Sequence, residues 1–370
     1  MPAEFIPGLE LSRRFYWQAV RPLLEAHFPE LPHAAARIGS GSDVLGFDTP
    51  MSMDHDWGPA VHIFLRNQDE ALAQSIREVM AQQLPRTFLG FSTHFGLTGE
   101  DDGTQWMQEA PEGPINHHVR PVTLQRFLWQ TLRWDISQPL DAIDWLTLPS
   151  QALRGVTAGA VHHDGIGELT AMRQKLAWYP RDVWLYLLAC GWQRIDQEQH
   201  LMPRAGYAGD ELGSALMGAR LARDVMHLGF LMERQYAPYP KWLGTAFQQL
   251  ACAGELAPLL WQAQRAASWQ ERMEALSRCY TTLARRHNGL GITNKQPEDV
   301  TQFFDRPFQV ISAEKFVKAL LKPITDPQVL AITRLGLIGS LDQFSDSTDL
   351  RSYPGWRLRL RRLLEPGADQ

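Results

Sequence analysis

A glycine- and aspartate-rich stretch, residues 39–57, lies between two short apolar segments, residues 34–38 and 61–65. Short apolar runs bounded by Gly and Asp are typical of buried strands joined by a turn. Asp54 and Asp56 stand two positions apart just before the second segment. In an extended strand their side chains point to the same side, where two carboxylates repel each other unless a cation lies between them. The stretch therefore predicts two strands with a polar turn and paired carboxylates at one end.

The paired carboxylates predict a metal site. Carboxylate oxygens suit Mg²⁺ or Mn²⁺, and Mg²⁺ usually binds one or two carboxylates together with substrate phosphates. Asp54 and Asp56 are therefore the predicted metal ligands and catalytic residues. Metal carboxylates of this kind indicate phosphoryl or nucleotidyl transfer, in which the metal stabilises charge on the attacking and leaving oxygens.

The turn itself contains groups suited to binding a nucleotide. Gly39-Ser40 and Gly41-Ser42 are two consecutive Gly-Ser pairs. Glycine lets the backbone approach a phosphate closely, and successive N–H groups in such a turn form an anion-binding concavity. Both pairs are expected to line a loop that binds the triphosphate of an NTP.

These residues resemble a known signature. Gly41-Ser42, Gly46, Ser52 and Asp54-x-Asp56 resemble the Gly-Ser…Asp-x-Asp signature of the nucleotidyltransferase superfamily of DNA polymerase β and the aminoglycoside nucleotidyltransferases. Longer segments are similar to a bacterial domain-of-unknown-function family placed in that superfamily, with a helical C-terminal domain; they are residues 41–48, 52–59, 233–244, 306–308 and 342–349. The resemblance implies transfer of a nucleoside monophosphate from an NTP to an acceptor hydroxyl. It also favours Gly41 and Ser42 over the first Gly-Ser pair, because Gly46 and Ser52 then fall into step.

The resemblance further implies a third carboxylate on a later strand, as a metal ligand or as the general base. The segment that should carry it, residues 116–122, contains no acidic residue. His118 is one substitute, because the pKa of histidine suits proton abstraction near neutrality. Asp164, near the expected domain junction, is another. The third alternative is that the position is absent.

Three further basic features are candidates for anion binding. Lys241 lies at the expected start of a helix, where a cation is unfavourable unless an anion is near, so a triphosphate contact is predicted. Arg173 and Lys175 are similar candidates. The arginines of residues 351–362 could bind a polyanion such as RNA. The spacing of Trp356 and the following leucines favours instead an amphipathic helix packed on the body, with its arginines in solvent.

The order of strand-like and helix-like patterns predicts the fold. An α/β nucleotidyltransferase domain with a small mixed sheet is expected over residues 1–155, and an all-α C-terminal domain over residues 156–370. The expected strands and helices are a helix at 12–27, strands at 34–38 and 56–65, a helix at 69–84, strands at 88–97 and 118–124, and helices at 127–132, 169–176, 181–195, 209–232, 241–253 and 269–286. Residues 98–114 are expected to form an acidic loop.

Bulk composition narrows the function classes. The net charge of −5 argues against a broad nucleic-acid-binding surface. A small-molecule acceptor is therefore expected, with a protein or tRNA acceptor, or a degenerate non-catalytic nucleotide-binding module, as alternatives. A metal-dependent phosphohydrolase built on His162-His163-Asp164 is disfavoured, because the glycines that follow predict a turn where its ligands need a helix.

The cysteines and apolar segments bear on the cell compartment. The three cysteines are widely spaced and lie in helix-like apolar contexts, which predicts buried free thiols: Cys190, Cys252 and Cys279. The N-terminus lacks the pattern of a signal peptide. The longest apolar stretch, residues 183–192, is too short to span a bilayer. A cytoplasmic protein without a membrane partner is expected.

Overall fold

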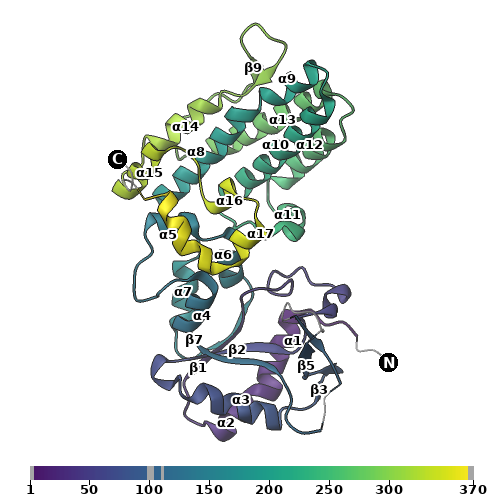
Figure 1. Ribbon diagram of the computed structural model, residues 1–370, viewed down its shortest axis with the longest axis vertical. Coiled ribbons are helices and arrows are strands. Elements are labelled where there is room, and N and C mark those ends of the chain that lie inside the picture. The colour runs from purple at the N-terminus through teal and green to yellow at the C-terminus, as the bar shows by residue number, and fades with distance from the viewer. Residues whose placement is uncertain (1–3, 98–103, 110–111, 366–370) are drawn as a thin grey trace. The chain divides into compact units, whose positions relative to one another are not determined.

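The computed structural model describes residues 4–97, 104–109 and 112–365, apart from the side chain of Asp54. The chain forms two compact units (Figure 1). Unit 1 contains residues up to Pro139 together with Ala152–Ala177, and unit 2 contains Leu140–Gln151 and the residues from Trp178 onward. Unit 1 combines a small mixed sheet with helices, and unit 2 is largely helical, which confirms the predicted fold class.

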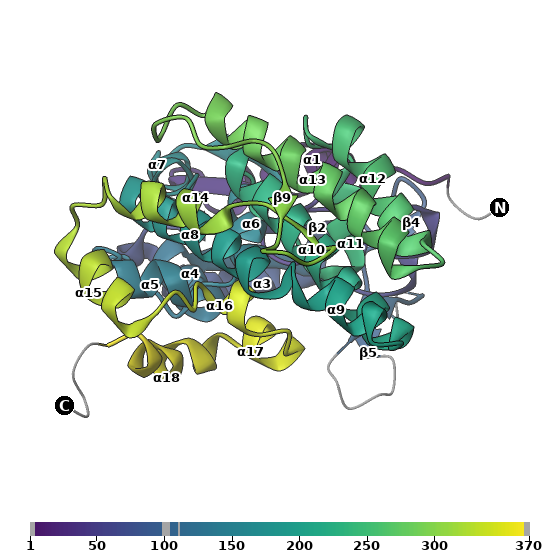
Figure 2. The same cartoon turned by 90° about the horizontal axis from the view of Figure 1, so that it is seen from above.

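Unit 2 is a helical assembly in which α10 packs against α8, α9, α12 and α13, while α14 packs on α8 (Figure 2). Its longer helices are α8 (Arg181–Glu198), α9 (Leu201–Tyr207), α10 (Glu211–Met232), α11 (Pro240–Phe247), α12 (Ala253–Arg265), α13 (Trp269–Gly289), α14 (Ala313–Leu321) and α15 (Pro327–Leu335). Its shorter elements are α5 (Ala142–Thr147), β9 (Thr301–Gln302), β10 (Gln309–Val310), α16 (Leu341–Phe344), α17 (Thr348–Ser352), α18 (Arg357–Leu360) and the 3₁₀ turns Pro354–Trp356 and Arg361–Leu363. The fully described range from 181 to 289 contains helices and no strand, as the sequence predicts.

The interior of unit 2 explains where its cysteines lie. Cys190, Cys252 and Cys279 are buried and free, as predicted. Burial raises the pKa of each thiol to about 12, so all three remain protonated near neutral pH. No helix in the described part of the chain is long and apolar enough to cross a membrane.

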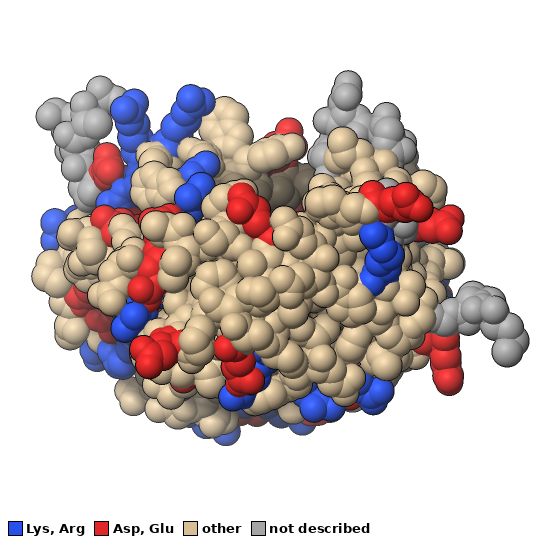
Figure 3. All heavy atoms as spheres, turned by 90° about the horizontal axis from the view of Figure 1, so that it is seen from below, with Lys and Arg blue, Asp and Glu red and all other residues tan. Residues whose placement is uncertain are grey.

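Charged side chains of both signs are interspersed on the face shown in Figure 3, with a broad uncharged area between them. A single-sign field of the kind that attracts a long polyanion is not seen on this face. The view agrees with the modest net charge of −5.

Unit 1 is built on a four-stranded sheet in the order β7-β2-β1-β8. The strands are β1 (His33–Arg37), β2 (Ala60–Leu65), β7 (His118–Thr123) and β8 (Ala160–Asp164). β1 runs antiparallel to both β2 and β8, whereas β2 and β7 are parallel. The sheet is therefore mixed. The parallel pair needs a crossover connection, which contains α3 (Leu72–Gln83).

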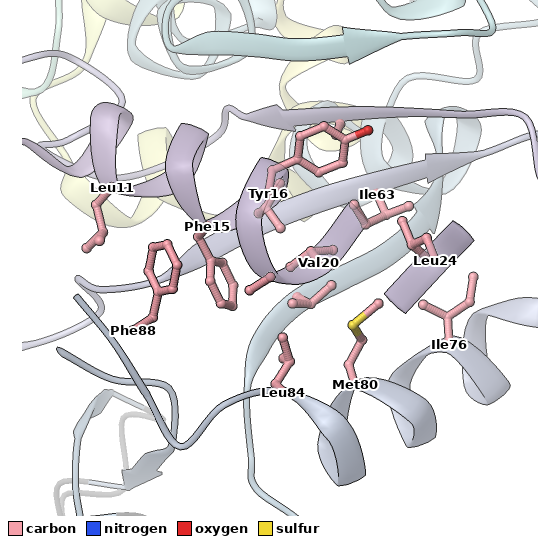
Figure 4. Packing of buried hydrophobic residues seen from close by; sticks show 14 of the residues in the cluster. Leu11, Phe15, Tyr16, Val20, Leu24, Ile63, Ile76, Met80, Leu84 and Phe88 are labelled. Atoms are coloured by element: carbon pink, nitrogen blue, oxygen red, sulfur yellow. The ribbon is translucent and has the colours of Figure 1, made fainter. Parts of the chain in front are cut away.

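The core of unit 1 lies on one face of this sheet (Figure 4). The N-terminal helices place Phe15, Val20 and Leu24 against Ile63 of β2 and Met80 of α3. The side chains of Phe15, Val20, Ile63 and Met80 are fully buried. Fully burying each side chain of this size stabilises the fold by about 1.5–3 kcal/mol, which anchors β1 and β2 firmly.

The remaining elements of unit 1 are short helices and two hairpins. They are α1 (Gly8–Phe15), the π-helical turn Tyr16–Val20, α2 (Arg21–His27), the 3₁₀ turns Pro50–Asp54 and Asn67–Asp69, β3 (Thr87–Phe88), β4 (Phe91–Ser92), β5 (Phe95–Leu97), β6 (Gln105–Met107), α4 (Leu124–Leu132) and α7 (Glu168–Lys175). α6 (Ser150–Thr157) lies at the junction of the two units in the sequence. The sequence predicts one strand over residues 88–97 and a loop over 98–114, but the described parts of these ranges form β4, β5 and β6.

Candidate functional site

The Gly-Ser turn follows β1 directly and depends on glycine. The Gly39 N–H donates to the Gly155 carbonyl at 2.8 Å, so the turn is tied to α6. Gly41 has φ of 136°, and a Cβ there would lie 2.2 Å from Oδ1 of Asp43. Both the backbone angle and the close approach exclude a larger residue at Gly41.

A buried ion pair holds the turn from within. Arg37, the last residue of β1, donates from Nε to Oδ2 of Asp43 at 2.6 Å and from Nη2 to Oδ1 at 2.9 Å. The two side chains are only 8% and 4% exposed. A bidentate pair of this kind fixes orientation as well as charge. No pattern in the sequence indicates this pair, because it depends on how the turn folds back onto the strand.

A second carboxylate of the same stretch is also engaged by the scaffold. Asp48 Oδ2 accepts from the Gly8 N–H, at the start of α1, at 2.6 Å and from Trp57 Nε1 at 2.9 Å. Asp43 and Asp48 therefore have structural roles. Asp56 has an exposed side chain close by in the sequence.

The turn presents unused backbone donors. Within residues 4–97, 104–109 and 112–365, the amide N–H groups of Ser40, Gly41 and Ser42 donate to no protein acceptor. Ser40 is exposed, and Gly41 and Ser42 are half-buried. Consecutive free N–H groups in a glycine-containing turn are the arrangement that binds an anion. The structure thus places the predicted phosphate-binding residues in a suitable loop.

The segment before β2 is not the strand that the sequence predicts. Pro50 begins a 3₁₀ turn that ends at Asp54, and the side chains of Thr49 and Ser52 cap it reciprocally. Asp56 then adopts φ of 49°, and β2 begins only at Ala60. The capped turn explains the difference, because it competes locally with an extended conformation. The alternation expected for strand residues therefore does not apply to the two aspartates.

Asp56 is fixed by the β5–β6 hairpin. Its N–H donates to the Gln105 carbonyl at 2.7 Å, and its Oδ1 accepts from the Gln105 N–H at 3.3 Å. Its carboxylate remains exposed. β1 and β2 are antiparallel neighbours with Ala36 opposite His62, so the end of β1 and the start of β2 lie side by side. They lie at one edge of the sheet, where an edge is the side that the strand ends form and not an outer strand. Asp56 and the Gly-Ser turn therefore lie at the same edge.

The metal site can be tested only in part. The side chain of Asp54 lies outside the described residues, so Asp56 is the described member of the predicted pair. Among the residues that the structure describes, no group of three His, Cys, Asp or Glu side chains gathers as a metal site. An exposed carboxylate beside an anion-binding turn fits Mg²⁺, whose coordination is commonly completed by substrate phosphates and water.

His118 lies at this edge too, in a structural setting. It begins β7 opposite Ala60, stacks on Phe95 with ring centroids 3.6 Å apart, and places Nε2 2.8 Å from Oε1 of Gln105. Since Oε1 accepts, Nε2 carries the ring proton. Burial, reinforced by Arg120 and other nearby cations, lowers the pKa of His118 to about 3. A group with this pKa is neutral near pH 7 and is a weak base.

The structure adds Arg120, which the sequence analysis did not select. It lies on β7 opposite His62, and its side chain is exposed. Protein atoms around it nevertheless lower its pKa through lost solvation, and Arg37 acts in the same direction. Asp56 and Asp43 act in the opposite direction. Arg120 comes near Asp56 only through the register of β2 and β7, which brings together residues far apart in the sequence.

Asp164 lies at the opposite edge of the sheet from the Gly-Ser turn. It pairs with Ala34 near the start of β1, whereas the turn follows the end of β1. Its Oδ1 accepts from the Gly167 N–H at 2.8 Å, and its Oδ2 accepts from the Thr170 N–H and hydroxyl at 2.9 and 2.5 Å. These bonds satisfy the N-terminus of α7. The structure therefore does not bring Asp164 together with Asp56.

The other basic candidates have varied settings. Lys241 lies in the first turn of α11 in unit 2, exposed, with Nζ 5.1 Å from the centroid of the Trp242 ring. In unit 1, Lys175 Nζ lies 4.9 Å from the centroid of the Trp134 ring. Arg173 donates to the Thr157 carbonyl and thereby caps the end of α6. The Lys241 contact with a triphosphate stays a prediction.

The arginines of residues 351–362 are less solvated than the sequence predicts. Arg351 and Arg357 are buried, at 8% and 4% exposure. Arg357 and Arg361 both bond Asp144, and Arg361 also bonds Asp141 at 2.7 Å. Acidic partners therefore engage Arg351, Arg357 and Arg361, whereas Arg359 and Arg362 are exposed, as the sequence predicts.

Comparisons with known proteins add a family match and one structural likeness. A family model described as a domain of unknown function (DUF4037) matches residues 145–243. A crystal structure of a nucleotidyltransferase-like protein from Exiguobacterium sibiricum is similar at 12% identity and a TM-score of 0.33, covering 84% of this chain and 89% of that chain. At this score the likeness does not establish a common fold. No curated protein matches the chain significantly.

Proposed function

We propose that unit 1 binds an NTP and transfers its nucleoside monophosphate to an acceptor hydroxyl. The observation that supports this most is the loop of three unused N–H groups, Ser40 to Ser42, at the same sheet edge as the exposed Asp56 carboxylate. A phosphate-binding turn beside a carboxylate is what a nucleotide polyphosphate with its divalent cation requires.

Each residue has a defined part in this proposal. The amides of Gly41 and Ser42 hold the phosphates, with Gly39 and Ser40 shaping the turn. Asp56, with Asp54, would hold Mg²⁺ or Mn²⁺, which supplies positive charge to the phosphates when bound. The acceptor oxygen forms a bond to the α-phosphorus, the bond from that phosphorus to pyrophosphate breaks, and the hydroxyl proton passes to solvent. The third carboxylate is not assigned, since β7 (His118–Thr123) contains no acidic residue.

The acceptor is proposed to be a small polar molecule. The net charge of −5, the mixed charges in Figure 3 and the ion pairs of Arg351, Arg357 and Arg361 all disfavour a long nucleic acid. A protein or tRNA hydroxyl is the second candidate. A non-catalytic nucleotide-binding module is a third, and the absence of an acidic residue from β7 favours it.

The test is label transfer from α-labelled ATP, CTP, GTP or UTP in a cell extract with Mg²⁺, followed by separation of small molecules, RNA and protein. We expect label in a small molecule and release of pyrophosphate. Asp56→Asn should reduce transfer at least about 100-fold, since loss of a residue that only hydrogen-bonds to a metal ligand already costs about 10–100-fold. Glu30→Gln is the matched control, because Glu30 is exposed in the turn before β1, at the other edge of the sheet.

Each result of this experiment discriminates among the proposals. Label in RNA or in protein would replace the small-molecule acceptor by that class. Bound nucleotide without any transferred label would favour the non-catalytic module. Full transfer by Asp56→Asn would contradict the site assignment.

A further inference from the structure

Arg120 occupies a distinctive place beside the candidate site. The parallel register sets His118 opposite Ala60 and Arg120 opposite His62, so these side chains share one face of the sheet. Asp56 lies four positions before the start of β2, at the same edge. Arg120 is thus an exposed cation on β7, near the edge of the sheet at which Asp56 lies.

Arg120 differs from Arg37 and Arg126 in having no carboxylate partner in the described part of the chain. Arg37 is paired with Asp43, and Arg126, on α4, is paired with Glu70 at 3.3 Å. No hydrogen bond or ion pair to a described residue engages the Arg120 guanidinium. A guanidinium left in this state has all five of its donors available to a ligand.

The surroundings of Arg120 increase its need for a negative partner. Protein atoms reduce its solvation, and the nearby charge of Arg37 opposes its own. The carboxylate of Asp43 also acts on Arg120 electrostatically. Arg37 already neutralises that carboxylate through two hydrogen bonds. A cation that lies near another cation is stabilised by an anion that can accept several of its hydrogen bonds.

We propose that Arg120 binds the polyphosphate of the nucleotide, across the sheet edge from the Gly-Ser turn. This inference rests on the proposed function. The planar guanidinium matches two phosphate oxygens at once, which a lysine does not. Arg120 and the turn amides then contact the same polyanion, and Asp56 keeps its carboxylate for the metal. Arg120 is a binding residue that sets where the phosphates lie.

Isothermal titration of the full chain with inorganic tripolyphosphate and, separately, with MgATP tests this role. Arg120→Gln should weaken binding of both by at least about tenfold, because it removes charge-assisted hydrogen bonds to the phosphate oxygens. Arg120→Lys should recover only part of the loss. Arg126→Gln removes the same charge from the opposite sheet edge and should leave binding unchanged. Thermal unfolding of each variant establishes that the fold is intact.

The outcomes separate this inference from the proposed function. If the unaltered protein binds MgATP and Arg120→Gln binds it equally well, the role of Arg120 is refuted while the proposed function stands. If the protein binds tripolyphosphate in an Arg120-dependent way but does not bind MgATP, Arg120 is an anion ligand and the proposed function fails. Binding of neither ligand would refute both.

Discussion

The buried pair of Arg37 and Asp43 holds the Gly-Ser turn in place, although Arg37 lies on β1 and not in the turn. Asp43 follows the Gly-Ser pairs directly, so its sequence position would equally suit a ligand of the bound cation. Both of its oxygens are instead used by Arg37 inside the protein. A buried pair contributes little net stability, but it costs much to break because one charge then stays buried without a partner.

Asp43→Ala should therefore lower the free energy of unfolding by about 3–5 kcal/mol. Glu70→Ala breaks the exposed pair with Arg126 and should cost only about 0.2–1 kcal/mol. Urea denaturation of the two variants measures the contrast. A loss below about 1 kcal/mol for Asp43→Ala would show that the turn does not depend on this pair.

At the scale of elements, the apolar pattern of contiguous residues predicts most of the long helices and the central strands. The strands at 34–38 and 118–124 and the helices at 181–195, 209–232 and 269–286 match β1, β7, α8, α10 and α13 closely. The predicted strand at 56–65 is four residues too long, because the capped turn at Pro50 and the left-handed Asp56 precede it. The hairpin of β5 and β6 was missed because its pairing joins segments across a polar loop.

The residues of the candidate site likewise fall into two groups, those indicated by contiguous sequence and those that depend on the tertiary fold. The Gly-Ser turn and Asp56 could be found from sequence, since contiguous residues carry their signal. The Arg37–Asp43 pair and the place of Arg120 could not, since each depends on strand register or on a folded turn. Asp164 is the converse case: the sequence offers it as one alternative for the missing carboxylate, whereas the register of β8 places it at the other edge from the Gly-Ser turn.

Asp164→Ala tests its role as the cap of α7. Removing the side-chain acceptor should destabilise the protein by about 0.5–2 kcal/mol, since two backbone N–H groups lose their partner. MgATP binding should not change, because the substitution lies at the other sheet edge. Asp164→Asn keeps a capping oxygen and should recover most of the stability. A large loss of transfer activity with unchanged stability would instead place Asp164 in the reaction.

At the scale of the whole molecule, buried histidines in both units set a common response to pH. Burial lowers the pKa of His118 to about 3 and the pKa values of His162 and His287 to about 4, and it lowers that of His62 well below the usual value. All four are neutral in the folded protein near pH 7. In the unfolded chain they return to about 6.5 and bind protons at higher pH than the folded state does.

Stability should therefore be fully present above about pH 6.5 and should fall as the pH drops toward 4, because the unfolded state then binds more protons. Each histidine can contribute a slope of up to about 1.4 kcal/mol per pH unit in this window. Urea denaturation at pH 7.5, 6.5 and 5.5 measures the effect before most carboxylates titrate. His287→Gln should reduce the slope, and a flat profile across these three values would argue against neutral buried histidines.

The assignment of residues 140–151 to unit 2 has a consequence for synthesis on the ribosome. The Ala142 N–H donates to Gln328, and Asp144 pairs with Arg357 and Arg361. These partners are translated roughly 200 residues later, which at about 5–20 residues per second is a delay of roughly 10–40 s. During that interval β8 can already complete the sheet of unit 1, while α5 still lacks the partners that it has in the folded protein. The strands of unit 1 can thus pair before residues 140–151, which precede β8 in the sequence, gain their partners in unit 2.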